Sequence, residues 1–451
     1  MSEPTPNGWR TFLTLWGTQS LSVVGSALSY FAITIYLTQT LYPNPDQKAS
    51  LAFALSAVAL AGALPAIFGS PIAGAWADRH DRRRVMLTCD FGSALVSALL
   101  AVLVVFGALP LWALVPLVAL GSLLGTFHGS AFDTSYAVLV PHDKLPRANG
   151  MMQTLWTLSG LLAPGLAAFL IAAPALLGQR GVALPLLHDG TALVFLLDAV
   201  SFVFAGLVLT RLHIPTPPRS DERPKSLWSD VGFGFKYIFA RRPLLWLLGT
   251  FSVVNFIGGP LGVFEPLIVK FTLGPDWTAR GLTFEAALAI LTTIGGLGGV
   301  LGGVLISTWG GLKERRVFGV LVPMILAGFA LIAFALSTNL YLSAFLAAIN
   351  FGMTPILNAH SQAIWQTQVP PEMQGRVFSV RRLIAQCTGP FSTFLAGIAG
   401  GVFSPSSVLL VLGIVQVVFC IAQLFNPYLR RVEDKAWLER IAAKRSTPAA
   451  D

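Results

Sequence analysis

Long apolar runs separated by short polar breaks are the dominant pattern along this chain. A helix that crosses a bilayer needs about 20 mostly apolar residues, and every run reaches that length. The breaks are rich in Gly, Pro or charged residues, which end helices. The pattern predicts twelve membrane spans, at residues 11–38, 50–77, 85–107, 110–134, 149–175, 190–210, 243–272, 284–308, 316–337, 339–364, 376–402 and 406–427.

The composition supports a membrane protein. Hydrophobic residues make up 54% of the 451 residues and charged residues only 11%, and the mean hydropathy is +0.70. Soluble globular chains carry about 25% charged residues. A chain this poor in charge cannot cover a water-facing surface, so we expect lipid around an all-α integral membrane protein. No nucleophile, base and orienting group can be placed together, so we expect no enzyme.

The basic residues predict the orientation of the spans. The net charge of +9 would suggest a nucleic-acid partner in a soluble chain. Here the Lys and Arg residues sit in short breaks, without a basic helix or base-stacking aromatic residues, so we expect no nucleic acid. With the N-terminus inside, the outer breaks contain only Lys48, Arg180, Lys270 and Arg280. This alternation fits the positive-inside rule, and both termini are predicted to be cytoplasmic.

A polar stretch in the middle of the chain predicts two halves joined by a linker. Residues 226–240 are predicted to form an amphipathic helix on the inner surface, with Trp228, Phe235 and Ile238 as anchors. Residues 431–445 predict a short charged helix. The expected division is an N-terminal six-helix bundle at 1–211, a cytoplasmic linker at 212–242, a C-terminal six-helix bundle at 243–427 and a cytoplasmic tail at 428–451.

The two halves repeat each other in sequence. A shift of about 233 positions pairs residues after the second span of each half, and a shift of 226 to 229 pairs prolines around the fifth span. The pairs are Trp76 with Trp309, Asp81 with Glu314, Pro141 with Pro370, and Pro164 with Pro390. We expect two pseudo-symmetric bundles, a substrate site near the midplane between them, and transport by rocking of one against the other.

The loop after the second span, GSPIAGAWADRHDRRRV at 69–85, resembles the signature loop of the major facilitator superfamily. It predicts a gating latch, in which the Asp78 carboxylate caps a helix of the other half, near Gly375 and Arg376. Arg82 would pair with Asp78 or with Asp133. The alternative is that the basic run only sets topology. The predicted latch residues are Gly74, Asp78, Arg82, Arg83, Asp133, Gly375 and Arg376.

The loop departs from the superfamily pattern at two places. Trp76 and Asp81 stand where Leu and Gly are usual, and Asp81 is expected to keep a left-handed turn, which Asp tolerates. In the second half Gly311 stands where Asp78 would be, so that copy has lost the acidic cap.

A motif in the fifth span resembles the antiporter motif of drug exporters in this superfamily. Small residues permit close helix packing and a proline kinks the helix. Thr388-Gly389-Pro390 repeats part of it in the eleventh span, and ordinary packing with a kink is the alternative explanation. The motif residues are Ser159, Ala163, Pro164, Ala167 and Ala168.

Segments along the whole chain narrow the resemblance to the macrolide-efflux and enterobactin-exporter branch of the superfamily. They are 10–38, 125–149, 194–204 and 370–380, with Phe127-His128 and Asp198 among their most specific points. The resemblance implies the major facilitator fold and a monomeric secondary transporter of the bacterial inner membrane. It also implies proton-driven export of amphipathic small molecules such as drugs, macrolides or siderophores. A lysophospholipid or metabolite transporter and a non-transporting sensor are the alternatives.

Polar residues inside the spans are candidates for coupling and binding. Glu265, before Pro266, is the first choice for a proton-binding carboxylate, although it could instead pair with Lys270. Asp198 is expected to pair helices, and His360 to pack with hydrogen bonds. The other candidate proton or substrate residues are Gln19, Ser22, Asn255, Asn350 and Asn358; Asp90, Arg381 and Arg382 are further intramembrane charges. The three cysteines indicate no disulfide or metal, and no cofactor is expected.

Overall fold

The computed structural model describes residues 8–141, 144–179, 190–214 and 227–446, and in these ranges the regular structure is entirely helical. Twelve of the described helical segments are long and apolar enough to cross a membrane, so the twelve predicted spans are confirmed. Their limits differ from the predicted ones by at most five residues. The segments are Gly8–Leu41, Pro45–Ala77, Arg82–Val105, Leu111–Ser135, Arg147–Gly178, Thr191–Leu209, Arg242–Thr272, Phe284–Trp309, Arg316–Leu336, Leu340–Gln368, Arg376–Val402 and Pro405–Leu424.

The chain folds as two compact units. The first contains Met1–Ser220 and Leu282–Thr293, and the second contains Asp221–Gly281 and Ile294–Asp451. The boundary falls inside the predicted linker, but residues 282–293 of the eighth span group with the first unit.

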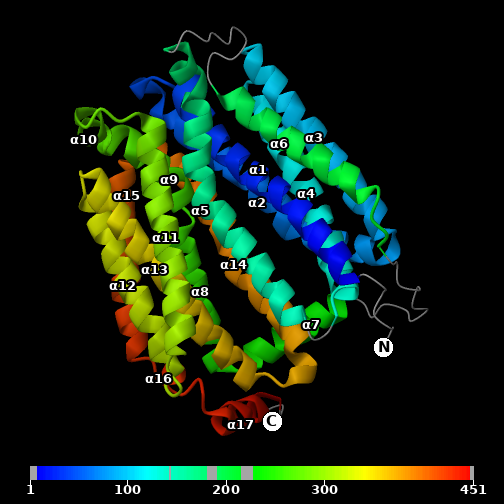
Figure 1. The fold of residues 1–451 in the computed structure, drawn as a ribbon. Coiled ribbons are helices and arrows are strands. Elements are labelled where there is room, and N and C mark those ends of the chain that lie inside the picture. The colour runs from blue at the N-terminus through cyan, green and yellow to red at the C-terminus, as the bar shows by residue number, and fades with distance from the viewer. Residues whose placement is uncertain (1–7, 142–143, 180–189, 215–226, 447–451) are drawn as a thin grey trace. The chain divides into compact units, whose positions relative to one another are not determined.

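Six long helices build the first unit. α2 packs on α4, α3 packs on α6 and α4, and α1 packs on α5 and α6 (Figure 1). One core cluster joins their ends through residues such as Phe12, Met86, Phe132 and Leu209. The helices are α1 (Gly8–Ile35), α2 (Lys48–Arg79), α3 (Arg82–Val105), α4 (Leu111–Leu139), α5 (Leu145–Gly178) and α6 (Thr191–Leu209).

The second unit contains six spans, of which α11 has its first ten residues in the first unit, and four shorter peripheral helices. α12 packs on α13 and α15, and α14 packs on α8 and α7. The spanning helices are α8 (Arg242–Gly258) with α9 (Leu261–Leu267), α11 (Phe284–Trp309), α12 (Arg316–Leu336), α13 (Leu340–Gln368), α14 (Pro371–Val402) and α15 (Pro405–Leu424). The peripheral helices are α7 (Leu227–Ala240), α10 (Gly274–Ala279) and the pair α16 (Pro427–Arg430) and α17 (Lys435–Ser446).

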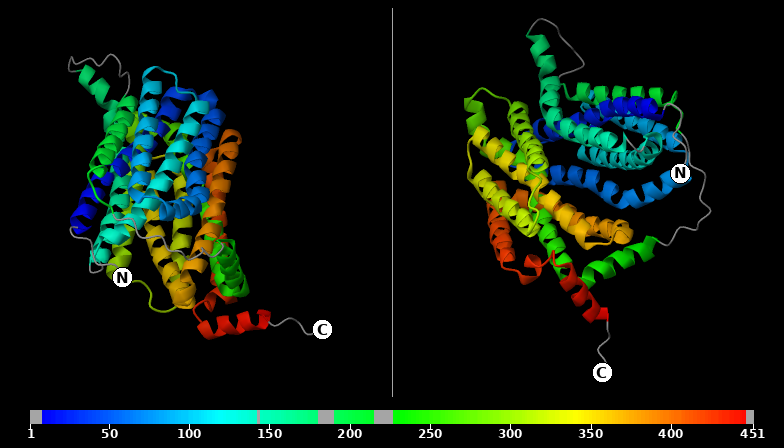
Figure 2. Two further views of the ribbon diagram at one scale, coloured as in Figure 1. Left: turned by 90° about the vertical axis from the view of Figure 1, so that its right-hand side faces the viewer. Right: turned by 60° about the horizontal axis from the view of Figure 1, so that its bottom comes forward.

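The linker helix α7 packs into protein, so the expected role of its apolar residues as membrane anchors is wrong for Ile238. That side chain has no exposed surface and belongs to the core cluster of the second unit, and Phe235 packs against the same cluster. The side chain of Trp228 lies outside the described residues. Arg241 at the end of α7 pairs with Glu439 of α17 at 3.0 Å, so linker and tail helix are joined (Figure 2).

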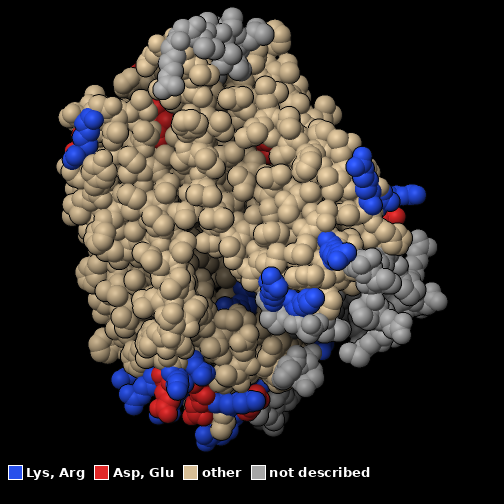
Figure 3. All heavy atoms as spheres, in the orientation of Figure 1, with Lys and Arg blue, Asp and Glu red and all other residues tan. Residues whose placement is uncertain are grey.

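The surface of the spans is apolar. Large side chains such as Leu95, Trp112 and Phe204 are exposed on helices that otherwise pack against protein. Figure 3 shows uncharged side chains over most of the visible face, with the largest group of charged side chains at the bottom and a few separate Lys and Arg side chains elsewhere. Such a surface needs lipid as its solvent.

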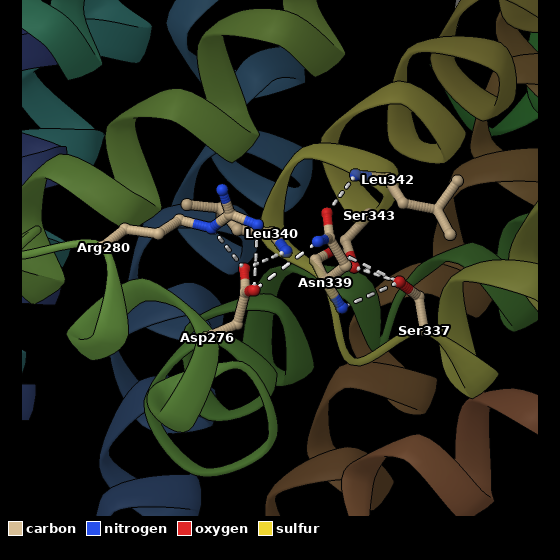
Figure 4. Close-up of polar contacts among 7 residues, drawn as sticks. All are labelled: Asp276, Arg280, Ser337, Asn339, Leu340, Leu342 and Ser343. Atoms are coloured by element: carbon tan, nitrogen blue, oxygen red, sulfur yellow. Dashed lines mark hydrogen bonds and ion pairs between the residues drawn. The ribbon is translucent and has the colours of Figure 1, made fainter.

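Short helix α10 is fixed to the start of α13 by one carboxylate (Figure 4). Asp276 accepts a hydrogen bond from the Leu340 backbone N–H at 2.9 Å, and the Arg280 guanidinium donates to both its oxygens at 3.1 Å. The guanidinium bond, with the backbone bond beside it, holds the pKa of Asp276 below its usual value. A negative charge is favourable at this helix N-terminus.

Candidate functional site

The signature loop forms a two-residue break between α2 and α3. Asp81 is the N-cap of α3, and its carboxylate accepts a hydrogen bond from the Arg84 N–H at 3.1 Å. Its φ is −62°, so the expectation of a left-handed turn at Asp81 is wrong. An N-cap acid satisfies a free N–H at the helix start, which explains why Asp suits this position.

The basic residues of this loop bind the ends of neighbouring helices. Arg82 is 8% exposed and donates to the Thr134 carbonyl of α4 at 3.0 Å, rather than pairing with Asp133. Arg83 donates to the Leu209 and Thr210 carbonyls, where the end of α6 carries partial negative charge. The basic run therefore ties α3 to α4 and α6.

Only part of the predicted latch lies in the described structure. The side chain of Asp78 and the surroundings of Gly375 lie outside the described residues, so their cap stays a prediction. A Cβ at Gly74 would meet no atom within 4 Å. Arg376 lies 4.4 Å from the ring centre of Phe233, which holds the start of α14 against the linker helix.

The antiporter-like motif forms one buried face of α5. Ser159, Ala163 and Ala167 are at most 3% exposed and follow one another at four-residue steps, which places them on one side of a helix. Pro164 is buried beside them and Ala168 is partly buried.

The corresponding proline segment in the second unit shows the close packing that small residues permit. On α14, Thr388 donates to the Ser252 carbonyl of α8 at 3.0 Å. A Cβ at Gly259 would lie 2.8 Å from the Gly389 carbonyl oxygen, a distance that only glycine allows.

Two of the predicted polar residues of α1 are buried in the first unit. Gln19 is 4% exposed and donates from its amide to the Asp90 carboxylate of α3 at 3.0 Å. Ser22 is 3% exposed, and its hydroxyl oxygen has no hydrogen-bond partner among the described residues.

Asp198 of α6 pairs helices, as the sequence predicted. Its carboxylate accepts hydrogen bonds from Ser29 at 2.9 Å, Ser97 at 2.8 Å and Ser26 at 3.5 Å. The donors lie on α1 and α3, and Asp198 is 3% exposed. All three bonds are made by hydroxyl groups, so the carboxylate is satisfied without a counter-ion.

Glu265 lies in a small, mostly apolar cavity within the second unit. Leu261, Leu331, Phe334, Leu346, Ala347, Asn350 and Phe351 line the cavity with it. No described residue hydrogen-bonds to its carboxylate, and the pairing with Lys270 is not formed. Asn350 donates instead to the Ala327 carbonyl at 3.0 Å.

The other polar candidates of the second unit have structural partners or face outward. Asn255 donates to the Ala385 carbonyl at 2.8 Å, and Asn358 is exposed. His360 accepts a bond from the Leu312 N–H at Nε2 and lies 2.7 Å from the Ile356 carbonyl through Nδ1. Both ring nitrogens are occupied, so His360 packs the α11–α12 loop and is not a free proton or substrate site.

Sequence reasoning missed two polar contacts of the first and second units. It did not pair Asp90 with Gln19 and His128, although all three lie within predicted spans. It also did not assign Glu433 of the tail, which accepts a hydrogen bond from the Arg316 N–H at 2.7 Å and caps α12. Side chains that meet across helices share no local spacing, so no sequence period could have indicated these pairs.

The chain is similar to known membrane transporters over most of its length. The family model for the Major Facilitator Superfamily matches residues 15–393. Macrolide efflux protein A of Streptococcus pyogenes is 25% identical over 402 residues, which cover 87% of this chain and 90% of that protein. The multidrug efflux pump Tap of Mycolicibacterium fortuitum is 26% identical over 388 residues, covering 84% and 88%.

Solved structures agree in fold. A bacterial homolog of the human lysosomal transporter Spinster, in an inward-facing and unoccupied conformation, has a TM-score of 0.63 at 17% identity and covers 98% of this chain and 96% of that one. The nucleoside transporter NupG has a TM-score of 0.65 at 16% identity, covering 92% of this chain and 98% of that one. At such identities the similarity concerns the fold alone.

Proposed function

Because the chain belongs to the major facilitator superfamily of membrane transporters, we propose that it is a proton-coupled exporter of amphipathic small molecules. Relatives that match most of the chain are named for macrolide efflux and multidrug efflux. Their names support export and a substrate with a large apolar part. We further propose that it acts as a monomer in the bacterial inner membrane with both termini in the cytoplasm, an orientation that the distribution of Lys and Arg favours.

The observation that carries proton coupling is the isolated Glu265 carboxylate. An ionised carboxylate in an apolar, low-dielectric cavity costs several kcal/mol unless it is paired, and no described residue pairs with it. Glu265 therefore binds a proton whenever its cavity is closed. If water reaches it when the cavity opens, the proton leaves, and this cycle couples proton entry to the conformational change.

The antiporter-like face of α5 and the predicted latch complete the mechanism. Ser159, Ala163 and Ala167 offer a flat surface on which a neighbouring helix can slide without side-chain interlock. Asp78 would hold the inner side closed by capping a helix N-terminus and would release it on opening. Ser22, whose hydroxyl has no hydrogen-bond partner among the described residues, is the candidate that would hydrogen-bond to the cargo within apolar surroundings.

Efflux from energised cells tests this function. Ethidium, a lipophilic cation, and erythromycin, a macrolide, are loaded into cells that express the protein, and their loss is followed with and without a protonophore. We expect loss that the protonophore abolishes, and a decrease of tenfold or more in Glu265→Gln at equal expression. Glu314→Gln is the matched control, because Glu314 is an exposed acid in the α11–α12 loop; it should transport normally.

Two results would change the conclusion. Full activity of Glu265→Gln would remove Glu265 from coupling and leave export in place. No loss of either compound from wild-type cells would favour a lipid or metabolite cargo, which reconstitution into liposomes with those cargoes would then test.

A further inference from the structure

A buried acid and a histidine face each other in the first unit, away from Glu265. Asp90 of α3 has no exposed surface, and its Oδ1 lies 3.2 Å from Nε2 of His128 on α4. The His128 side chain keeps 18% of its surface exposed. Gln19 of α1 donates to the other carboxylate oxygen at 3.0 Å. Three helices therefore bring one acid, one base and one amide to a single point.

This pair needs a proton on one of its two members. A carboxylate with a single neutral donor is poorly stabilised in the membrane interior, and Gln19 is that donor. The 3.2 Å separation lets one proton lie on the acid, which leaves both groups neutral, or on the imidazole, which leaves an ion pair. Asp90 Oδ1 and His128 Nε2 have no hydrogen-bond partner among the described residues, so no competing contact holds either atom.

Few other ionisable groups face the pair. Cys89, next to Asp90 on α3, is buried. Arg82 lies two turns earlier on α3 and binds the Thr134 carbonyl. Asp198 of α6 bonds to Ser97, which lies two turns after Asp90 on α3, and it is held by the three serine donors described above. The described parts of α1 and α4 bring only Gln19 and His128 to this point.

Asp90 and Asp198 differ in their surroundings: those of Asp90 suit a proton-binding group, and those of Asp198 suit a carboxylate that holds helices together. Both carboxylates are buried in the first unit. Among the described residues Asp198 has three hydroxyl donors and no base beside it, so its bonds persist in either protonation state. Asp90 has one amide donor and a base, so its charge depends on where the proton lies. His128 keeps 18% of its side-chain surface exposed and Asp90 keeps none, so a proton that enters the pair reaches the imidazole before the carboxylate.

We propose that Asp90 and His128 form a proton-binding pair in the first unit, separate from Glu265, in which His128 passes the proton between solvent and the buried carboxylate. The pair's place in transport rests on the proposed proton-coupled export. The amide of Gln19 stabilises the ionised acid, so a movement of α1 that withdraws this amide favours the protonated acid. The pair thereby links proton binding to the packing of α1 on α3 and α4.

Infrared difference spectroscopy of the full-length protein in liposomes tests the pair without a cargo. The carbonyl stretch of a protonated carboxylic acid is followed between about pH 5 and pH 9, on both sides of the ordinary histidine pKa of about 6.5. The component of the band that Asp90→Asn removes is the signal of the pair. We expect the component to persist in Asp198→Asn and to titrate at a pH displaced by at least about half a unit in His128→Gln, because the base next to the acid is gone.

The proposal is overturned if Asp90→Asn removes no titrating component, or if His128→Gln leaves its midpoint in place. Should Asp90→Asn fail to fold, the comparison of His128→Gln with the wild type still decides, since an unchanged band would reject the pair. Ethidium efflux then separates this proposal from the proposed function. Wild-type efflux that Asp90→Asn retains in full rejects a role in coupling, whereas absence of proton-driven efflux in the wild type counts against the proposed function alone.

Discussion

The three serine hydroxyls that bond to Asp198 allow a quantitative test of whether its hydrogen bonds or its charge stabilise the first unit. Ser29 and Ser97 both donate to Oδ2, and Ser26 donates weakly to Oδ1. In Asp198→Asn the amide oxygen can take the place of Oδ2 and keep both strong bonds. The amide NH₂ then faces Ser26, whose hydroxyl can accept instead. We expect a cost of at most about 2 kcal/mol, because bonds to a charged acceptor become bonds to a neutral one.

Asp198→Ala removes the acceptor from all three serines. A buried donor left without an acceptor costs about 1–3 kcal/mol, and serine hydroxyls recover part of this by bonding to carbonyls of their own helix. We therefore expect Ala to cost about 3 kcal/mol more than Asn. For a unit of 150–250 residues this corresponds to a melting temperature lower by about 6–12 °C.

Thermal unfolding of the purified protein in one detergent, followed by intrinsic fluorescence, measures this difference. Equal melting temperatures of the Asn and Ala variants would show that the serine bonds do not stabilise the unit. An Asn variant that melts like the wild type but no longer expels ethidium would show that the charge itself acts in transport, and the structural assignment of Asp198 would be wrong.

Three further predictions concern the second unit. The pKa of Asp276 lies below its usual value, so the stability that its charge contributes is complete above about pH 3.9 and is lost as the pH falls further. The melting temperatures of the wild type and Asp276→Asn should therefore differ at pH 7 and converge only below about pH 3.9. Glu433→Ala removes the cap from the Arg316 N–H and should speed hydrogen exchange in the first turn of α12, at a cost of about 1 kcal/mol. Gly298 packs against an α13 carbonyl, so Gly298→Leu should abolish a monodisperse protein in gel filtration, whereas Gly303→Leu, with open space at its Cβ, should not.

The spans could be predicted because a membrane imposes the same requirement at every point of a helix. About 20 apolar residues must follow one another, and this signal is local and long. The ends were less certain, since helices such as α13 run on past the apolar region to Gln368. Such ends depend on contacts with other helices, like the amide of Gln368 on the Glu433 carbonyl.

The sequence could predict which side chains of the site are unusual in a membrane span, but it could not predict which residues they contact. Sequence reasoning selected Asp198, Glu265 and His360 because a polar group in a membrane span is costly. It could not separate them, because the difference lies in what faces each one. Asp198 meets three hydroxyls, His360 meets two backbone groups, and Glu265 meets apolar side chains.

The two sequence repeats satisfy the same physical need in different ways. Each third span of a half begins after a short basic loop, and its first N–H groups have no partner within the helix. In the first unit Asp81 stands directly before α3 and supplies the acceptor from the loop itself. In the second unit the aligned acid, Glu314, is exposed and α12 begins one position later, after Arg315 in a left-handed conformation with φ of 52°.

That one-residue displacement moves the loop acid away from the helix start. Glu433, more than a hundred positions further along the chain, takes its place and accepts the Arg316 N–H at 2.7 Å. The tail is therefore part of the fold of the second unit, because it provides the cap that the repeat has lost. Truncation of the chain before Glu433 should destabilise α12. The first unit, whose cap Asp81 lies in its own loop, should keep its stability.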